Sequence, residues 1–158
     1  MNSQQTTQKI GLALGGGAVL GAAHIGVLRA LEECQLSVDM VAGTSIGALV
    51  GTLYAFGIPW QEIQNITMKM KWLDISKVSL SKFGLMTNKK IQSLIHDHVG
   101  DVDFIQANIP LAIIASDIQN GKKVILKTGR VAEAVMASTC IPGVFSPVIK
   151  KEQVLVDG

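Results

Sequence analysis

The sequence has 158 residues and a mass of 16.8 kDa, which suits a single domain large enough to bury a sizeable core. Hydrophobic residues make up 48% and charged residues 16%, so a packed globular protein is expected and extensive disorder is not. The net charge is +2, aromatic residues make up 4% and the basic residues are scattered, which argues against nucleic-acid binding. Cys34 and Cys140 form no metal-binding or redox motif, and we interpret both as buried thiols.

Two stretches, 10–28 and 41–60, lack charged residues over a length close to that of a membrane span. Each is rich in glycine and begins with a short β-type run, which is typical of a buried parallel strand followed by a buried helix. The first ten residues lack the arrangement of a signal peptide, although Lys9 with the apolar run after it leaves an export signal open. We therefore expect a cytoplasmic protein, with peripheral contact to a membrane surface as an open alternative.

Strand-type and helix-type segments alternate through most of the chain. The pattern predicts strands at 9–16, 38–43, 109–118 and 153–158, a hairpin at 120–129, and helices at 21–34, 45–57, 60–75, 87–100 and 130–140. Asn120–Gly121 is the expected hairpin turn, and Thr87 is the expected N-cap of its helix. The alternation predicts an α/β fold, a three-layer α/β/α sandwich with a mainly parallel central sheet.

The segment "DMVAGTSIGALVG", residues 39–51, contains a Gly-x-Ser-x-Gly motif between a predicted strand and a predicted helix. This is the context of a nucleophile elbow, in which Gly43 and Gly47 leave room for a strained Ser45. The N-terminus of the helix adds a partial positive charge that favours an alkoxide. The alternative is a tight turn in which Ser45 only caps the helix.

A glycine-rich loop, 15–21, follows the first predicted strand. Glycines let the main chain approach a reacting group closely, so the loop can present N–H groups to an oxyanion. A dinucleotide-binding loop is the rival interpretation, but neither register of the glycines fits its pattern fully. A P-loop is excluded because no Gly-Lys-Ser/Thr sequence occurs.

Four segments together resemble the patatin-like phospholipase family: "GLALGGGAVLGAAHIGVLRAL", "GTSIG", "ASTCIPGVFSPV" and the terminal "VLVDG". They occur in the family's order and span nearly the whole chain. The resemblance implies a serine hydrolase of lipid acyl esters, without a cofactor or a metal, that uses a Ser–Asp dyad and no histidine. Ser45 would be the nucleophile and Asp157 the general base, with an oxyanion hole formed by Gly15, Gly16, Gly17 and Ala18. Residues 1–9 would be a polar tail and 10–158 the patatin-like domain.

The sequence departs from the family's pattern in two places, the glycine loop and the C-terminal motif. In the glycine loop, Ala18 replaces a glycine and Leu20 a basic residue. The chain ends at Gly158, so we expect a domain truncated at its C-terminal end and a loosely positioned Asp157 side chain. A catalytically weak relative that binds lipid or a protein partner is therefore the alternative function.

Two other residues are alternative bases. His24 lies in the first predicted helix, where a packing or capping role is the simpler interpretation. Asp117 ends the stretch "LAIIASD" of the predicted strand and is expected to cap the turn that follows. The segment from Trp60 to Trp72 mixes aromatic, aliphatic and basic residues, which suits either a helix packed on the domain or contact with a lipid surface.

Overall fold

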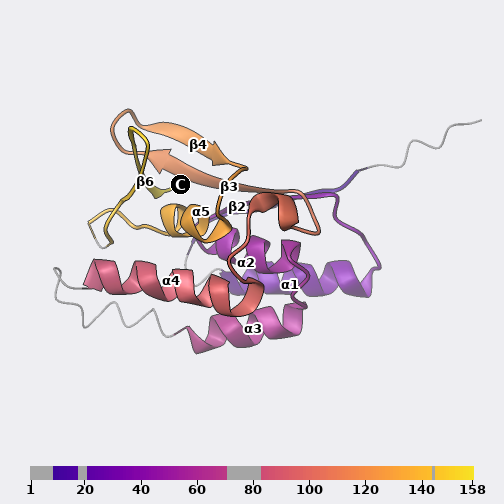
Figure 1. Ribbon diagram of the computed structural model, residues 1–158. Helices are drawn as coiled ribbons and strands as arrows, with labels where there is room; N and C mark the ends of the chain where they lie inside the picture. The colour runs from indigo at the N-terminus through magenta and orange to yellow at the C-terminus, as the bar shows by residue number, and fades with distance from the viewer. Residues whose placement is uncertain (1–8, 18–20, 71–82, 144) are drawn as a thin grey trace, which may run out of the picture.

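The computed structural model describes residues 9–17, 21–70, 83–143 and 145–158 (Figure 1). Strands and helices alternate along the first part of the chain, and the last part is mostly β-structure. The elements in chain order are β1 (Gly11–Leu14), α1 (Gly21–Glu33), β2 (Met40–Thr44), α2 (Ile46–Ala55), α3 (Trp60–Lys69), α4 (Phe83–Val99), the 3-10 turn η3 (Phe104–Gln106), β3 (Leu111–Asp117), β4 (Lys122–Leu126), α5 (Val131–Ser138), β5 (Val148–Lys150) and β6 (Gln153–Asp157).

The sheet is mixed and its pairings centre on β3. Strand β1 pairs in parallel with β2, and β2 in parallel with β3, whereas β4 and β6 pair antiparallel with β3, and β5 antiparallel with β6. The predicted α/β class is confirmed, but only the β1–β2–β3 part of the sheet is parallel. Tight turns join β3 to β4 and β5 to β6, and they reverse the chain and therefore give antiparallel pairs. Strand β6 also pairs antiparallel with β3, which is distant in sequence.

Strands β2 and β6 lie end to end along one edge of β3. Residues 113–114 of β3 pair with both β2 and β4, and residues 115–117 pair with both β4 and β6. Because a strand has two edges, β4 occupies one edge and β2 and β6 share the other. The two strands run toward each other, so their C-terminal ends meet where Thr44 is level with Ile114 and Asp157 with Ala115.

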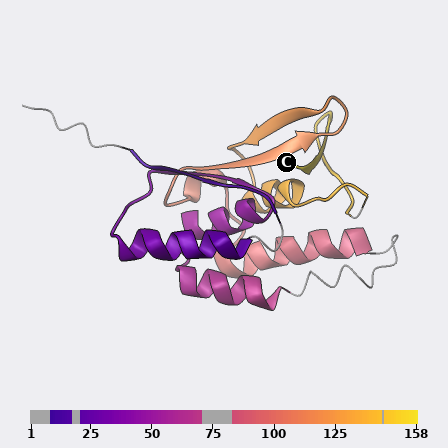
Figure 2. The ribbon, with the colours of Figure 1, turned by 180° about the vertical axis from the view of Figure 1, so that it is seen from behind.

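All the helices of the described residues lie on one side of the sheet (Figures 1 and 2). Helices α2 and α5 pack directly on the strands, and α1, α3 and α4 pack against those two helices. Leu111, Ile113 and Ala115 of β3 face the helices and are buried, while Ala112 and Ile114 on the opposite face are only partly covered. The described part of the chain therefore forms a sheet with helices on one face, and not all of the predicted three-layer sandwich.

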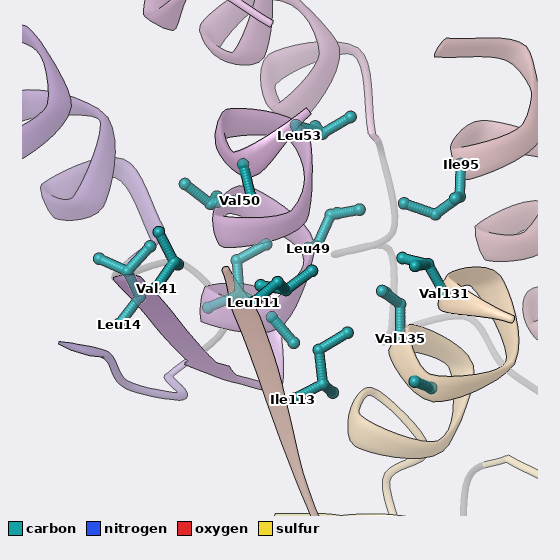
Figure 3. Close-up of a cluster of buried hydrophobic side chains, with 14 of the residues drawn as sticks. Leu14, Val41, Leu49, Val50, Leu53, Ile95, Leu111, Ile113, Val131 and Val135 are labelled. Carbon is teal, nitrogen blue, oxygen red and sulfur yellow. The ribbon is translucent and has the colours of Figure 1, made fainter. Parts of the chain in front are cut away.

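The core lies between the sheet and α2, α4 and α5 (Figure 3). Figure 3 shows Leu49 of α2, Ile95 of α4, Ile113 of β3 and Val131 of α5 pointing into this space. Every residue of α2 except Tyr54 is buried, as expected for a helix that is apolar all round. Its uncharged sequence is thus explained by burial inside the domain. No helix in the described ranges is long and apolar enough to cross a membrane.

Most predicted elements are confirmed, with differences at their ends. Helix α4 begins at Phe83, so Thr87 lies inside the helix and the prediction that it is the N-cap was wrong. The turn at Gly121 has the expected positive φ of 68°. Cys140 is buried, as predicted, but Cys34 is exposed just after α1.

Helix α3 packs on the domain through Ile63 and Ile66, which are buried. This agrees with the interpretation of a packed helix for the segment that begins at Trp60. Lys71 and Trp72 lie outside the described residues.

Candidate active site

Ser45 lies in the sharp turn between β2 and α2, in a conformation that side chains rarely adopt. Its φ is 54° and its ψ is −124°. A non-glycine residue held in such a region costs about 1–3 kcal/mol of strain, which the surrounding packing has to supply. The chain therefore forms the predicted elbow, with the serine side chain at the N-terminus of α2, where the helix dipole is positive.

The two glycines of the motif are required by close approaches of the backbone. A Cβ atom on Gly43 would lie 2.6 Å from the Cα of Ala48, and one on Gly47 would lie 2.6 Å from the carbonyl oxygen of Gly15. Real Cβ atoms essentially never come so close to other atoms. The small residues thus let α2 start directly against β1 and the loop that follows it.

The meeting of β2 and β6 brings Ser45 and Asp157 together. Ser45 directly follows the last residue of β2, and Asp157 is the last residue of β6. The Oγ of Ser45 donates a hydrogen bond of 2.7 Å to the Oδ2 of Asp157. This distance lies within the range expected for a base that accepts the serine proton, about 2.6–3.2 Å.

The backbone of Asp157 is held in the sheet and its side chain has the Ser45 hydroxyl as a partner, while the loose positioning expected for this side chain stays a prediction. Its N–H donates a 2.8 Å hydrogen bond to the carbonyl of Cys140, and its strand pairs with β3. Burial raises the pKa of Asp157 above its ordinary value of 3.8, while hydrogen bonds from Ser45 and from the backbone of Gly158 act in the opposite direction. A raised pKa makes this carboxylate a stronger base than an exposed aspartate.

The glycine loop lies beside Ser45. A Cβ atom on Gly16 would be 3.3 Å from the Cβ of Ser45, and Gly17 has a φ of 132° that favours glycine. Within the described residues, the N–H groups of Gly16 and Gly17 have no hydrogen-bond acceptor. Gly16 of the predicted oxyanion hole thus lies against the serine, with Gly15 and Gly17 beside it in the chain; Ala18 and Leu20 lie outside the described residues.

His24 contacts the glycine loop and not the serine. Its Nε2 lies 2.8 Å from the carbonyl oxygen of Gly15. Because a carbonyl can only accept, this nitrogen carries a hydrogen and donates it. The contact fixes the Gly15 carbonyl toward α1, consistent with a packing role for His24.

Asp117 caps the turn after β3, as the simpler interpretation predicted. Its carboxylate is buried and accepts hydrogen bonds from the backbone N–H of Gln119 and from the side chain of Asn120. Both oxygens are thereby committed to the β3–β4 turn, which makes Asp117 a poor candidate for the base.

Two residues of the site were not predicted: one is the last residue of α5 and the other lies two residues after it. Ser138 accepts a hydrogen bond from the backbone N–H of Ser45, and Cys140 accepts the one from Asp157 through its carbonyl. Burial, and secondarily the charge of Asp157, raise the pKa of the Cys140 thiol to about 11. The only sequence signal was the segment "ASTCIP", which was noted for the family resemblance alone.

The described ranges contain no group of three or more His, Cys, Asp or Glu side chains placed to hold a metal ion. The polar groups gathered at the elbow include the hydroxyls of Ser45 and Ser138, the carboxylate of Asp157 and backbone N–H groups. The class of protein that this geometry defines is an α/β protein with a sharp strand-to-helix turn whose serine faces an aspartate.

Comparison with known proteins assigns the family. Residues 12–158 match the family model described as "Patatin-like phospholipase", and the chain belongs to this family. An uncharacterized NTE family protein of Mycobacterium tuberculosis is 35% identical over 158 residues, which cover 97% of this chain and 43% of the relative. The neuropathy target esterase sws of Drosophila melanogaster is 34% identical over 161 residues, covering 97% of this chain and 11% of that protein.

Solved structures share the fold at low sequence identity. VipD from Legionella pneumophila matches with a TM-score of 0.72 and 16% identity, over 95% of this chain and 46% of that one. ExoU from Pseudomonas aeruginosa, solved in complex with SpcU, matches with a TM-score of 0.68 and 19% identity, over 91% of this chain and 41% of that one. The chain thus spans less than half the length of these proteins and of the mycobacterial relatives.

Proposed function

We propose that this protein hydrolyses carboxylic esters of lipids, with Ser45 as nucleophile and Asp157 as general base. The observation that carries the proposal is the 2.7 Å hydrogen bond from the Ser45 hydroxyl to Asp157, made from a strained elbow at a helix N-terminus. A serine that only capped the helix would direct its hydroxyl at a backbone N–H of the first turn, and Ser45 makes no such bond.

The reaction follows from the positions of these groups. The Oγ of Ser45 attacks the ester carbonyl carbon while its proton passes to the Oδ2 of Asp157. The tetrahedral intermediate then releases the alcohol, which takes the proton from Asp157, and an acyl group remains on Ser45. Water attacks this acyl-serine with Asp157 again as base, which releases the fatty acid and restores the serine.

The negative oxygen of the tetrahedral intermediate needs hydrogen-bond donors, and we assign these to the glycine loop. Gly16 lies against Ser45, and among the described residues the N–H groups of Gly16 and Gly17 have no acceptor. We keep Gly15 and Ala18 as the flanking members of the loop. Loss of one such donor typically lowers turnover about 10²–10³-fold.

We propose long-chain lipid esters as substrates, presented at a membrane or micelle surface. The support is the family and the esterase named among its relatives. The rate should rise when a fatty-acyl ester is taken above its critical micelle concentration. A rate that does not respond to aggregation, together with no binding to liposomes, would contradict this substrate class.

Labelling by a fluorophosphonate probe, with ester hydrolysis measured in parallel, tests the chemistry. The wild-type chain should be labelled, Ser45→Ala should be neither labelled nor active, and Asp157→Asn should lose most of both. Asp117→Asn is the matched control, because it removes a buried carboxylate at the end of a neighbouring strand while keeping an oxygen for the Gln119 N–H. Equal labelling of Ser45→Ala, or normal turnover of Asp157→Asn, would refute the dyad. No labelling of a folded wild-type chain would favour a weakly catalytic, lipid- or protein-binding relative.

A further inference from the structure

The C-terminal end of α5 contacts the backbone of both dyad residues. Ser138 is the last residue of α5 and is fully buried. Its Oγ accepts a 2.9 Å hydrogen bond from the N–H of Ser45 and donates a 2.5 Å hydrogen bond to the carbonyl of Ile114 in β3. The hydroxyl thereby links the nucleophile turn to the central strand.

Two residues further on, the same segment reaches the other member of the dyad. The carbonyl of Cys140 accepts the hydrogen bond from the N–H of Asp157 at 2.8 Å. Ser45 and Asp157 are separated by 112 residues in sequence, yet their backbones are tied to residues that are two apart. The position of α5 relative to the sheet thus affects the distance between the serine and the carboxylate.

We propose that Ser138 is a positioning residue for the reaction: its hydroxyl holds the strained Ser45 so that Oγ stays on Asp157 and faces the glycine loop. The inference rests on the proposed function, since it concerns the geometry of the same nucleophile. Ser138 itself does not touch the reacting atoms.

The physical reason lies in the conformation of Ser45. Its φ of 54° is strained, so the turn relaxes toward a commoner conformation unless contacts oppose this. In this conformation the Ser45 N–H meets the hydroxyl of the fully buried Ser138, and an N–H left without an acceptor beside this buried position is unfavourable. The Ser138 hydroxyl satisfies this donor and simultaneously binds a carbonyl of β3.

Few side chains can replace this hydroxyl. The site needs one group that both accepts from Ser45 and donates to Ile114, in a space with no exposed surface. Alanine does neither, and the thiol of cysteine does both weakly. A misplacement of the nucleophile by about 1 Å can cost about 100-fold in rate.

The test compares Ser138→Ala with Thr139→Val in the full chain. Thr139 is the neighbouring buried hydroxyl, and it donates only to helix carbonyls of Val135 and Met136. Both changes remove one buried hydroxyl from the same helix end, but only Ser138 contacts Ser45. We expect Ser138→Ala to lower kcat about 10–100-fold with KM changed less than about twofold. The rate of fluorophosphonate labelling should fall in parallel, and Thr139→Val should keep kcat within about twofold of wild type.

A purely structural role would give a different result. If both variants lose thermal stability to a similar extent and keep similar kcat values, Ser138 has no special part in the reaction and the inference is wrong. If Ser138→Ala does not fold, Ser138→Cys decides instead: its kcat should fall well below that of Thr139→Val, and equal kcat values would overturn the inference. A folded wild-type chain without turnover or labelling would refute the proposed function itself, and the positioning role with it.

Discussion

The hydroxyl of Ser45 lies 2.7 Å from the carboxylate of Asp157 because two strands that run toward each other end at the same point of β3. Strand β2 leaves the sheet after Thr44, and the remaining residues of β3 on that edge pair with β6. The turn at Ser45 and the carboxylate of Asp157 are therefore not brought together by a long loop. Their separation is fixed by the hydrogen bonds of one sheet edge and by the end of α5.

The strain at Ser45 should be measurable as a lower free energy of unfolding. Ser45→Gly and Ser45→Ala both remove the hydroxyl and differ only by the Cβ atom. At a φ of 54° and a ψ of −124°, glycine relieves the steric conflict that alanine keeps. We expect the glycine variant to be more stable than the alanine variant by about 1 kcal/mol, because strain of about 1–3 kcal/mol outweighs the entropy cost of glycine. Urea denaturation of the two inactive variants checks this, and an alanine variant of equal or greater stability would show that the turn is unstrained.

The acid limb of the pH–rate profile should lie above the ordinary pKa of an aspartate. Asp157 acts as a base only when it is ionised, and burial raises its pKa above 3.8. Activity should therefore fall as the pH is lowered through a midpoint higher than 3.8. The profile of kcat/KM for a soluble ester gives this midpoint for the free enzyme, and a midpoint below that value would contradict the assignment of Asp157 as the base.

The same raised pKa has a consequence for stability. In the folded state Asp157 binds its proton more tightly than in the unfolded state, so its contribution to stability is fully present below the unfolded pKa and is lost as pH rises through the folded pKa. At neutral pH the buried charge is unfavourable, so Asp157→Asn should unfold at a higher temperature than wild type. This difference should shrink as the pH falls through the raised folded-state pKa and should be lost below 3.8. A variant that is less stable than wild type at neutral pH would mean that the hydrogen bonds to the carboxylate outweigh its burial.

Gly47 should tolerate no side chain, whereas a glycine in α1 should. A Cβ atom at Gly47 would lie 2.6 Å from the carbonyl oxygen of Gly15, so Gly47→Ala has to displace backbone. We expect a loss of at least about 2 kcal/mol in the free energy of unfolding. Gly26 lies in α1, and a Cβ atom added there would meet nothing within 4 Å, so Gly26→Ala should add about 0.8 kcal/mol through helix propensity. Thermal unfolding of the two variants provides the comparison. Equal stabilities would show that α2 can shift away from Gly15 without a cost in stability.

The local part of the site was predictable from the sequence because it is contiguous. The strand, the Gly-x-Ser-x-Gly motif and the helix follow one another within residues 40–55, so the elbow at Ser45 needed no knowledge of distant contacts. Asp157 was assigned only through the family resemblance. No periodicity or spacing places it near Ser45, since the contact depends on two strands sharing an edge of β3.

The antiparallel pairing of β6 with β3 and β5 was not predicted for a related reason. Alternating strands and helices favour parallel pairing, and this holds for β1, β2 and β3, which are joined through helices. Strand β5 has only three residues, too few for an alternating pattern, so its hairpin with β6 left no signal. Ser138 was missed because a serine at a helix end has many ordinary roles, and its partner Ser45 is 93 residues away.

His24 should affect the rate by orienting the glycine loop and not by accepting a proton. Its Nε2–H binds the carbonyl of Gly15, which lies next to the proposed oxyanion donor Gly16. Glutamine can supply an N–H donor at a similar distance but cannot act as a base at neutral pH. We therefore expect His24→Ala to lower kcat/KM about tenfold, as a small shift of positioned groups does, and His24→Gln to recover most of that loss. Steady-state hydrolysis of one soluble ester gives kcat/KM for both variants and checks this prediction. If glutamine were as inactive as alanine, the imidazole would be needed for its basicity and the dyad would have to be replaced by a mechanism that includes His24.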